Sequence, residues 1–253
     1  MPESSRSLSG PRYSIRFVVI AALFVTCLLI ANIIAVKIVE LPGGIIAPAG
    51  VVIFPLSYLF GDVLTEVYGY AAARKVIWLG FFCNLIAVLA IAVAGALPAA
   101  PFWQGQAAYE TILGFTPYLL IASFCAYLVG EFLNSFVLAR MKVATNGRWL
   151  WTRTIGSTLI GEGADTVIFI LLAFGATGAL GLATPLPFAV LLNLILTQWI
   201  LKVAYEIVAT PLTYVMVGYL KRRDGVDVYD THTNFSPIVL GAGREDTLVR
   251  AES

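Results

Sequence analysis

Six long apolar runs dominate this chain, and each is long enough to cross a lipid bilayer as a helix. A hydrocarbon core needs about 20 helical residues to span it. The runs cover residues 15–36, 45–70, 76–97, 115–138, 154–182 and 188–220. The first is too long for a signal-peptide core, and no small-residue cleavage site follows it. We therefore expect an all-α integral membrane protein with a single bundle of six transmembrane helices.

The composition agrees with this expectation and limits the chemistry. Hydrophobic residues make up 59% of the chain and charged residues only 12%, whereas soluble domains carry about 25% charged residues. The three cysteines lie inside apolar runs without metal-ligand spacing, and the single histidine, His232, lies in the polar tail. We therefore expect no metal and no other cofactor. The net charge of +1 gives no sign of nucleic-acid binding.

Basic residues gather on alternate connections between the runs. These residues are Arg6, Arg12, Arg16, Arg74, Lys75, Arg140, Lys142, Arg148, Arg153, Lys221, Arg222 and Arg223, whereas the other connections carry only Lys37. Cytoplasmic loops of membrane proteins are rich in Lys and Arg, so the pattern predicts that both termini are cytoplasmic. We expect a disordered tail over residues 1–14, a six-helix membrane domain over 15–220 with a loop at 98–114, and a polar cytoplasmic tail over 221–253.

The stretch from Leu59 to Lys75 carries two acids, Asp62 and Glu66, four residues apart. On a helix, residues at this spacing share one face. The basic pair Arg74 and Lys75 follows at the cytoplasmic end, so depth counting puts both acids toward the cytoplasmic mouth. We expect them to form gate or exit-side contacts. The alternative is an interfacial charge cluster that only fixes the helix end.

Other polar side chains fall at membrane depth, where they are costly and usually face a bundle interior or a water-filled cavity. The candidate binding residues are Asn84, Glu131, Asn134, Glu162, Asp165, Gln198 and Lys202, with the rings of Trp78 and Tyr205 beside them. At about 1.5 Å of rise per residue, the acids and amides converge near one layer. One lysine cannot neutralise all these carboxylates, so the surplus must be protonated, hydrated or in contact with a ligand.

The chemistry of this layer indicates the kind of ligand that it would bind. Carboxylates accept paired N–H donors, and amides offer a donor and an acceptor together. Aromatic rings can stack on a flat molecule. We therefore expect a small, planar, hydrogen-bond-rich solute that is neutral or cationic. For Lys202 and Glu206, a structural ion pair within one helix is the alternative.

Four blocks of the chain carry a family resemblance. They are Asp62-Val-Leu-Thr-Glu-Val-Tyr-Gly-Tyr70 followed by Ala73-Arg74, Arg153-Thr-Ile-Gly-Ser157 with Asp165 downstream, Lys202 to Glu206 before Thr210-Pro211, and Asp227-Val-Tyr-Asp-Thr-His-Thr-Asn-Phe235. On these blocks the chain resembles the queuosine precursor transporter family, formerly called the putative vitamin uptake transporter family. The resemblance runs from the first helix into the tail, and the first block is its most specific part.

The resemblance implies a multi-pass protein of the bacterial inner membrane that imports 7-deazaguanine bases, preQ0 and preQ1, for salvage into tRNA queuosine. The candidate binding residues would hold the base, and Asp62, Glu66, Arg74 and Glu206 would lie at the gate or exit side. The implied partners are the deazapurine base and the lipid bilayer. A homodimer and an energising subunit both stay open.

Two other functions stay open at this point. The chain could be the substrate-binding subunit of an ATPase-energised importer, since small residues such as Ala31 and Ala35 permit helix contacts. It has no Walker loop to hydrolyse ATP itself. It could also be an intramembrane enzyme that uses paired carboxylates, although no protease motif of that class occurs. We expect a transporter and not an enzyme.

Overall fold

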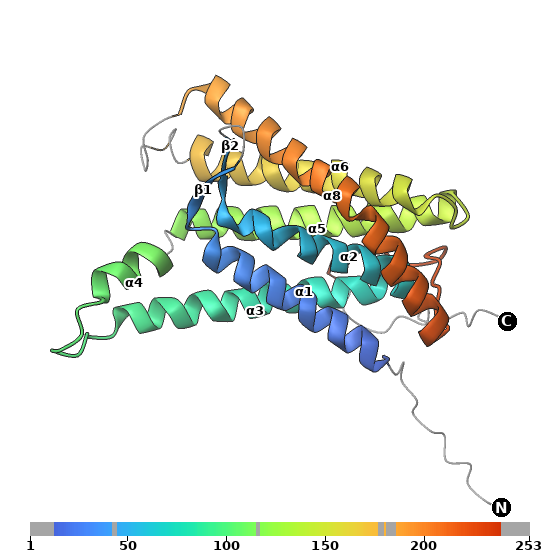
Figure 1. The fold of residues 1–253 in the computed structure, drawn as a ribbon, viewed down its shortest axis with the longest axis horizontal. Coiled ribbons are helices and arrows are strands. Elements are labelled where there is room, and N and C mark those ends of the chain that lie inside the picture. Colours follow the sequence, from blue (N-terminus) through green and yellow to red (C-terminus); the bar gives the residue numbers. More distant parts are fainter. Residues whose placement is uncertain (1–12, 42–44, 115–116, 177–179, 181–185, 239–253) are drawn as a thin grey trace, which may run out of the picture.

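The computed structural model describes residues 13–41, 45–114, 117–176, 180 and 186–238, and the helices among them run side by side in a bundle (Figure 1). The predicted turn at 41–44, most of the predicted N-terminal tail and the end of the fifth predicted span fall largely outside the described residues. The long helices are α1 (Ile15–Ile34), α2 (Phe54–Tyr68), α3 (Tyr70–Ala96), α5 (Pro117–Ala144), α6 (Leu150–Ile170) and α8 (Phe188–Asp224). The π-helical turn η2 (Leu171–Ala176) extends α6.

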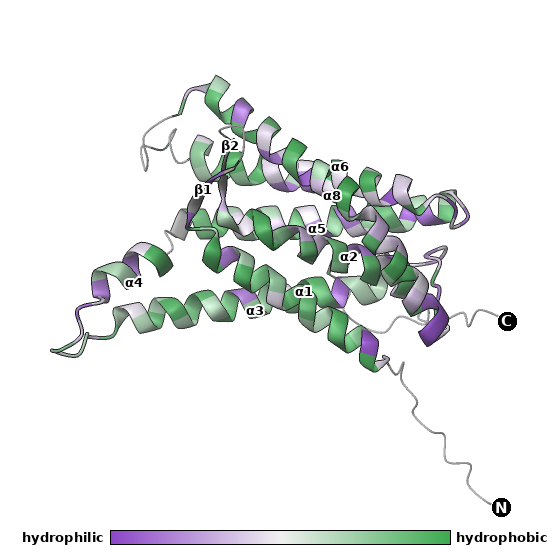
Figure 2. Cartoon of the chain, in the orientation of Figure 1, coloured by the Kyte–Doolittle hydropathy of each residue, from purple (hydrophilic) through white to green (hydrophobic). Residues whose placement is uncertain are grey.

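Five of the described helical segments are long and apolar enough to cross a membrane, which confirms a helical integral membrane protein. They cover Ile15–Ile34, Tyr70–Ala96, Leu119–Ala144, Leu150–Ala176 and Phe188–Asp224. Figure 2 shows apolar residues along most of α1 and α3. On α3, one exposed stripe at helical spacing consists of Leu79, Phe82, Ile86, Leu89 and Val93. Such a stripe is costly in water but matches the surrounding lipid of a membrane-spanning helix.

The second apolar run differs from the continuous helix predicted over residues 45–70. Strand β1 (Ile38–Leu41) pairs antiparallel with β2 (Ile45–Pro48), and the 3-10 helix η1 (Ala49–Val52) leads into α2. Pro48 and Pro55 explain the irregular entry, because proline lacks the N–H that a continuous helix would need at either position. The helix α2 therefore has only 15 residues, or about 22 Å.

The short helix α2 lies in the interior of the bundle. Its residues from Ser57 to Leu59 and from Gly61 to Tyr68 are all buried. Irregular backbone at membrane depth is tolerated where protein covers it or where it lines a cavity. This position explains why a helix too short to span the bilayer alone can lie at the centre of the fold.

The described part of the chain begins and ends at the same end of the bundle. Arg16, at the start of α1, places Nη1 2.5 Å from Asp224 Oδ1 at the end of α8. Tyr68, the last residue of α2, donates its hydroxyl proton to Asp224 Oδ2 at 2.6 Å. Figure 2 shows hydrophilic residues gathered at this end of α8. The basic loop predicted over residues 140–153 is shorter than expected, because α5 continues to Ala144 and α6 begins at Leu150.

Part of the predicted polar tail packs against the junction of α2 and α3. Gly69 breaks the two helices apart with φ of 81° and ψ of 168°, a conformation that only glycine adopts readily. The Val228 N–H donates to the Val67 carbonyl at 3.2 Å. The Asp230 carboxylate accepts from the Tyr70 N–H at 3.1 Å and so caps the first turn of α3. The tail therefore holds the α2–α3 break in place.

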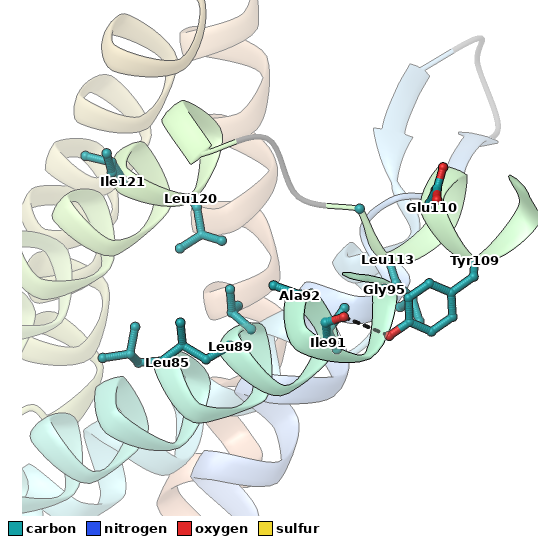
Figure 3. Close-up of a pocket in the computed structure, with 12 residues that line it drawn as sticks. Leu85, Leu89, Ile91, Ala92, Gly95, Tyr109, Glu110, Leu113, Leu120 and Ile121 are labelled. Carbon is teal, nitrogen blue, oxygen red and sulfur yellow. Dashed lines mark hydrogen bonds between the residues drawn. The ribbon is translucent and has the colours of Figure 1, made fainter. Parts of the chain in front are cut away.

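The connection predicted as a loop over residues 98–114 contains a short helix, α4 (Gln106–Leu113). It lies beside the last turns of α3, where the Tyr109 hydroxyl donates to the Ile91 carbonyl at 2.9 Å. Between α3, α4 and α5 lies an apolar cavity of about 410 Å³, lined mainly by Leu85, Leu89, Ala92, Leu113, Leu120 and Ile121 (Figure 3). A cavity with this lining offers a polar ligand few hydrogen bonds.

Candidate functional site

The polar side chains of α2, α5, α6 and α8 form a buried layer inside the bundle. We call it the acidic layer, and it consists of Asp62, Glu131, Asn134, Glu162, Asp165, Lys202 and Glu206. Asp62, Glu131, Asn134, Glu162 and Glu206 are each at most 2% exposed. Charged groups at this depth carry a desolvation cost that only partners, protonation, water or a ligand can offset.

Two glycines let α5 and α6 approach closely enough to form this layer. A Cβ atom at Gly161 would lie 2.5 Å from the Cβ of Asn134, and one at Gly130 would lie 2.6 Å from the Cβ of Asp165. No larger residue fits at either position without moving a helix. This contact brings the polar face of α5 against the polar face of α6, as small residues commonly do between membrane helices.

Lys202 of α8 is the cation that the described residues place in the acidic layer. Its Nζ lies 2.5 Å from Asp165 Oδ2 and 3.2 Å from Glu162 Oε2. The predicted alternative, an ion pair with Glu206 on the same helix, is not among the described salt bridges, because Lys202 reaches across to α6. The rings of Phe54 and Tyr58 also lie 5.2 and 5.7 Å from Nζ.

Asp62 belongs to this layer rather than to the end of the bundle. Its Oδ1 accepts from the Asn134 amide at 2.7 Å. The carboxyl groups of Glu206, Glu131 and Glu162 lie within electrostatic range of Asp62. The depth estimate from sequence put Asp62 toward the cytoplasmic mouth, but α2 starts only at Phe54, so Asp62 falls in its middle.

Many acceptor atoms of this layer have no hydrogen-bond partner among the described residues. These buried atoms are Asp62 Oδ2, both carboxylate oxygens of Glu131, Asn134 Oδ1, Glu162 Oε1 and Glu206 Oε1, and the hydroxyl oxygens of Thr158 and Thr166 are also unpartnered. Buried polar groups in folded proteins are usually paired. The layer is therefore arranged to accept hydrogen bonds from a bound molecule, from water or from its own protons.

A second cluster, which we call the terminal ion cluster, closes the end of the bundle where α8 finishes. It consists of Glu66, Lys142, Arg153, Lys221 and Asp227. Glu66 accepts from Arg153 through both carboxylate oxygens at 2.7 Å and from Lys221 Nζ at 2.7 Å. Lys142 donates to the Val228 carbonyl at 2.7 Å and so ties the cluster to the tail. Three cations surround two carboxylates, so both carboxylates are fully paired.

Asp227 is the member of this cluster that lies beyond the last helix. Burial raises the pKa of its carboxyl group, but the hydrogen bond from Lys142 and the charges of Lys142 and Lys221 outweigh burial. The pKa of Asp227 therefore lies below its ordinary value of 3.8. A carboxylate held charged in this way links the tail to α5 and α8 at neutral pH.

Three other predicted residues, Arg74, Trp78 and Asn84, form hydrogen bonds outside the acidic layer. Arg74 donates to the carbonyls of Asn234 and Ser236 at 2.8 Å, and the Trp78 indole N–H donates to the Pro237 carbonyl at 2.7 Å. Asn84 accepts from Asn32 at 3.1 Å and joins α3 to α1. Arg74 and Trp78 thus contact the tail, and their predicted roles in gating and substrate binding stay predictions.

Gln198 and Tyr205 are half-buried on α8. Sequence reasoning had not selected Tyr58 as a site residue, although its side chain is buried and interacts with Glu162. Its position four residues before Asp62 on the same helix was a usable signal. Sequence reasoning also placed Lys142 and Arg153 in a basic loop, although each is only 1% exposed. Nothing local marks them, because their partner Glu66 belongs to another helix.

Membrane-spanning helices around a buried acidic layer are typical of a membrane transport protein. Comparison with known sequences agrees, because the family model described as "Putative vitamin uptake transporter" matches residues 48–216. The chain belongs to this family. The matched region contains the whole acidic layer. No solved structure matches the chain.

Three relatives carry related names. The "Probable queuosine precursor transporter" of Bacillus subtilis (strain 168) is 34% identical over 187 residues, which cover 73% of this chain and 77% of the relative. The "Queuosine precursor transporter" of Escherichia coli (strain K12) is 32% identical over 121 residues, 48% of this chain and 52% of the relative. The "Probable queuosine precursor transporter" of Haemophilus influenzae (strain ATCC 51907 / DSM 11121 / KW20 / Rd) is 32% identical over 128 residues, which cover 49% of this chain and 51% of the relative.

These findings confirm the resemblance to the queuosine precursor transporter family. The relatives are named as transporters, so the prediction that this chain is not an enzyme is also confirmed. Together with its apolar helices, they identify the chain as a multi-pass bacterial membrane protein.

Proposed function

We propose that this protein imports queuosine precursors, the 7-deazaguanine bases preQ0 and preQ1, across the bacterial inner membrane for salvage into tRNA queuosine. The names of the three relatives support the class of substrate. The observation that carries the proposal for this chain is the set of unpartnered, buried acceptor oxygens in the acidic layer. A guanine-like edge offers several N–H donors to such acceptors, and the aminomethyl group of preQ1 adds a cation.

The charge of the layer favours such a base over a nucleotide. Its one described cation, Lys202, is already paired with Glu162 and Asp165. A phosphate group would therefore meet carboxylates and no available lysine, which is strongly unfavourable at low dielectric. A neutral base or a cationic aminomethyl base offsets the negative charge instead.

We propose six membrane-crossing segments with both termini in the cytoplasm, and α2 with its hairpin counts as the second. The contact between Arg16 at the start of α1 and Asp224 at the end of α8 supports an even number of crossings. The basic residues at this end, with Lys221 and its neighbours Arg222 and Arg223, support a cytoplasmic location for it.

Within this scheme the base binds to the acidic layer, where Asp62 and Glu206 join Glu131, Asn134, Glu162, Asp165 and Lys202. The terminal ion cluster around Glu66, together with Arg74 and the tail that it holds, forms the closed cytoplasmic gate. Opening toward the cytoplasm would require the Glu66–Arg153 pair to separate. The arrangement supports alternating access around a site in the middle of the bundle.

Uptake in cells tests the function directly. The protein is expressed in a bacterial strain that can neither make queuosine precursors nor import them, and preQ1 is supplied at nanomolar concentration. We expect the wild type to restore queuosine in tRNA, and Glu162→Gln and Asp165→Asn to lose most of that activity. Glu110→Gln, an exposed carboxylate on α4, is the matched control and should behave as the wild type.

Two outcomes would count against the proposal. A well-expressed wild type that restores no queuosine would contradict the function. Normal queuosine levels with both Glu162→Gln and Asp165→Asn, at normal expression, would contradict the assignment of the site to the acidic layer.

A further inference from the structure

One carboxylate of the acidic layer is set apart from the others. Glu131 on α5 is 2% exposed, and neither of its carboxylate oxygens has a hydrogen-bond partner among the described residues. By contrast, Glu162 and Asp165 are paired with Lys202, and Asp62 accepts from Asn134. Among the described acids of this layer, Glu131 is the one whose two carboxylate oxygens are both buried and unpartnered.

The surroundings of Glu131 explain why the protein itself supplies no donor to it. Gly61 faces it from α2, where an added Cβ would lie 3.5 Å from Glu131 Oε2 and 3.4 Å from the Phe24 ring. Both neighbours are apolar at this point. The Tyr127 hydroxyl, one helical turn away, is buried and donates to the Ile77 carbonyl at 2.9 Å. Of these three neighbours, Gly61 and Phe24 therefore offer no side-chain donor, and the Tyr127 hydroxyl already donates to a carbonyl.

Two free oxygens on one carboxylate match a ligand with two parallel N–H donors. A guanine-type ring presents this pattern, because its ring N–H lies next to its exocyclic amino group. A hypoxanthine-type ring keeps the ring N–H but lacks the amino group. An adenine-type ring has an acceptor nitrogen where guanine has the N–H. A buried carboxylate therefore binds the guanine-type edge most tightly, because only that edge donates two adjacent hydrogen bonds to it.

We propose that Glu131 is the specificity-determining residue of the site and reads the paired N–H edge of a 2-amino-4-oxo base. This inference rests on the proposed function and narrows it. Asn134, three residues along the same helix face, offers its unpartnered Oδ1 as an additional acceptor beside Glu131. The lysine-paired acids Glu162 and Asp165 then contact other parts of the base.

Equilibrium binding of two ligands to the purified full chain tests the inference. The ligands are 7-deazaguanine and 7-deazahypoxanthine, which differ only in the exocyclic amino group. A charge-assisted hydrogen bond contributes roughly 1.5–3 kcal/mol, so we expect the wild type to prefer 7-deazaguanine roughly tenfold to hundredfold. The Glu131→Gln variant replaces one acceptor by a donor, and we expect it to lose this preference.

The variant is well matched, because glutamine has the shape of a protonated glutamic acid. If Glu131 were a purely structural, protonated residue, Glu131→Gln would keep both affinity and preference. Glu131→Asp retains two acceptor oxygens and is expected to bind more weakly with the preference retained. Glu110→Gln on α4 should bind both bases as the wild type does.

A ligand-side test keeps the inference open to refutation even if Glu131→Gln does not fold. A methyl group on N1 of 7-deazaguanine, the ring nitrogen next to the exocyclic amino group, removes one of the two donors. We therefore expect wild-type binding of this base to fall at least tenfold. Wild-type protein that binds neither unmodified base would overturn the proposed function and the inference with it. Wild-type binding of 7-deazaguanine with an unchanged preference in Glu131→Gln, or undiminished binding of the methylated base, would overturn the inference alone.

Discussion

The Arg153 guanidinium on α6 donates two hydrogen bonds to the Glu66 carboxylate on α2, from Nε to Oε2 and from Nη2 to Oε1, each 2.7 Å long. Both side chains are buried. The change Arg153→Met removes both of these charge-assisted hydrogen bonds, each of which typically contributes about 1.5–3 kcal/mol, while Lys221 still pairs with Glu66 at 2.7 Å. We therefore expect Arg153→Met to lower the thermal unfolding temperature of the detergent-purified protein by several degrees.

Arg148 offers the control for this change, since its side chain is exposed on the same connection. Arg148→Met should leave the unfolding temperature nearly unchanged. Equal unfolding temperatures for wild type and Arg153→Met would show that this pair does not stabilise the closed end of the bundle.

Gly69 is expected to be intolerant of any side chain. Its φ of 81° and ψ of 168° cost other residues about 1–3 kcal/mol, and an added Cβ would lie 2.6 Å from Val228 Cγ1. Gly69→Ala should therefore lower thermal stability and loosen the tail. Gly218→Ala is the matched control, because nothing lies within 4 Å of its added Cβ. Limited proteolysis of the tail checks the second effect, and wild-type protection in Gly69→Ala would contradict it.

The close contact of α5 and α6 should be required for transport. At Gly161 an added Cβ would lie 2.8 Å from the Asn134 backbone nitrogen, so Gly161→Ala must push the helices apart and disorder the acidic layer. We expect uptake of preQ1 to fall at least tenfold at normal expression. Gly175→Ala, whose added Cβ meets its nearest neighbours at an ordinary 3.8 Å, should transport normally. Normal uptake by Gly161→Ala would mean that the site tolerates a wider helix spacing.

The ionisation of Asp227 should make stability depend on pH in the acid range. Its pKa is lower in the folded protein than its ordinary value of 3.8. A depressed carboxyl pKa stabilises the fold fully above the unfolded-state pKa, and this stabilisation is lost as the pH falls through the folded-state pKa. Thermal unfolding measured from pH 7 to about pH 3 should therefore show a weaker acid dependence for Asp227→Asn than for the wild type. The same fall in unfolding temperature with falling pH in the wild type and in Asp227→Asn would contradict the ion pair with Lys142.

Much of the fold could be predicted from apolar runs, because a lipid-facing helix needs an uninterrupted apolar stretch. The runs at 15–36, 76–97, 115–138, 154–182 and 188–220 each correspond to a described helix. The run at 45–70 does not correspond to one helix. An apolar sequence alone does not distinguish a strand pair followed by a short buried helix from one long helix. Its hairpin depends on pairing with Ile38 to Leu41, which lie outside the run.

The acidic layer was only partly predictable, for a related reason. Glu131, Asn134, Glu162 and Asp165 could be placed because their helices are continuous and their depth follows from counting. The bond between Asp62 and Asn134 could not be predicted, because it depends on α2 lying beside α5. The partners of Arg153 and Lys142 could not be predicted, since each pairing depends on which helices are neighbours in space.

The binding of a deazaguanine base by the acidic layer is tested most directly by ligand-induced thermal stabilisation of the purified full chain. A ligand that binds only the folded state raises stability by about 2.7 kcal/mol at 100 times its Kd. We predict that preQ1 and preQ0 raise the unfolding temperature of the wild type, that adenine does not, and that the double variant Glu162→Gln, Asp165→Asn loses the shift. No shift with either precursor, or an equal shift in the double variant, would contradict the account.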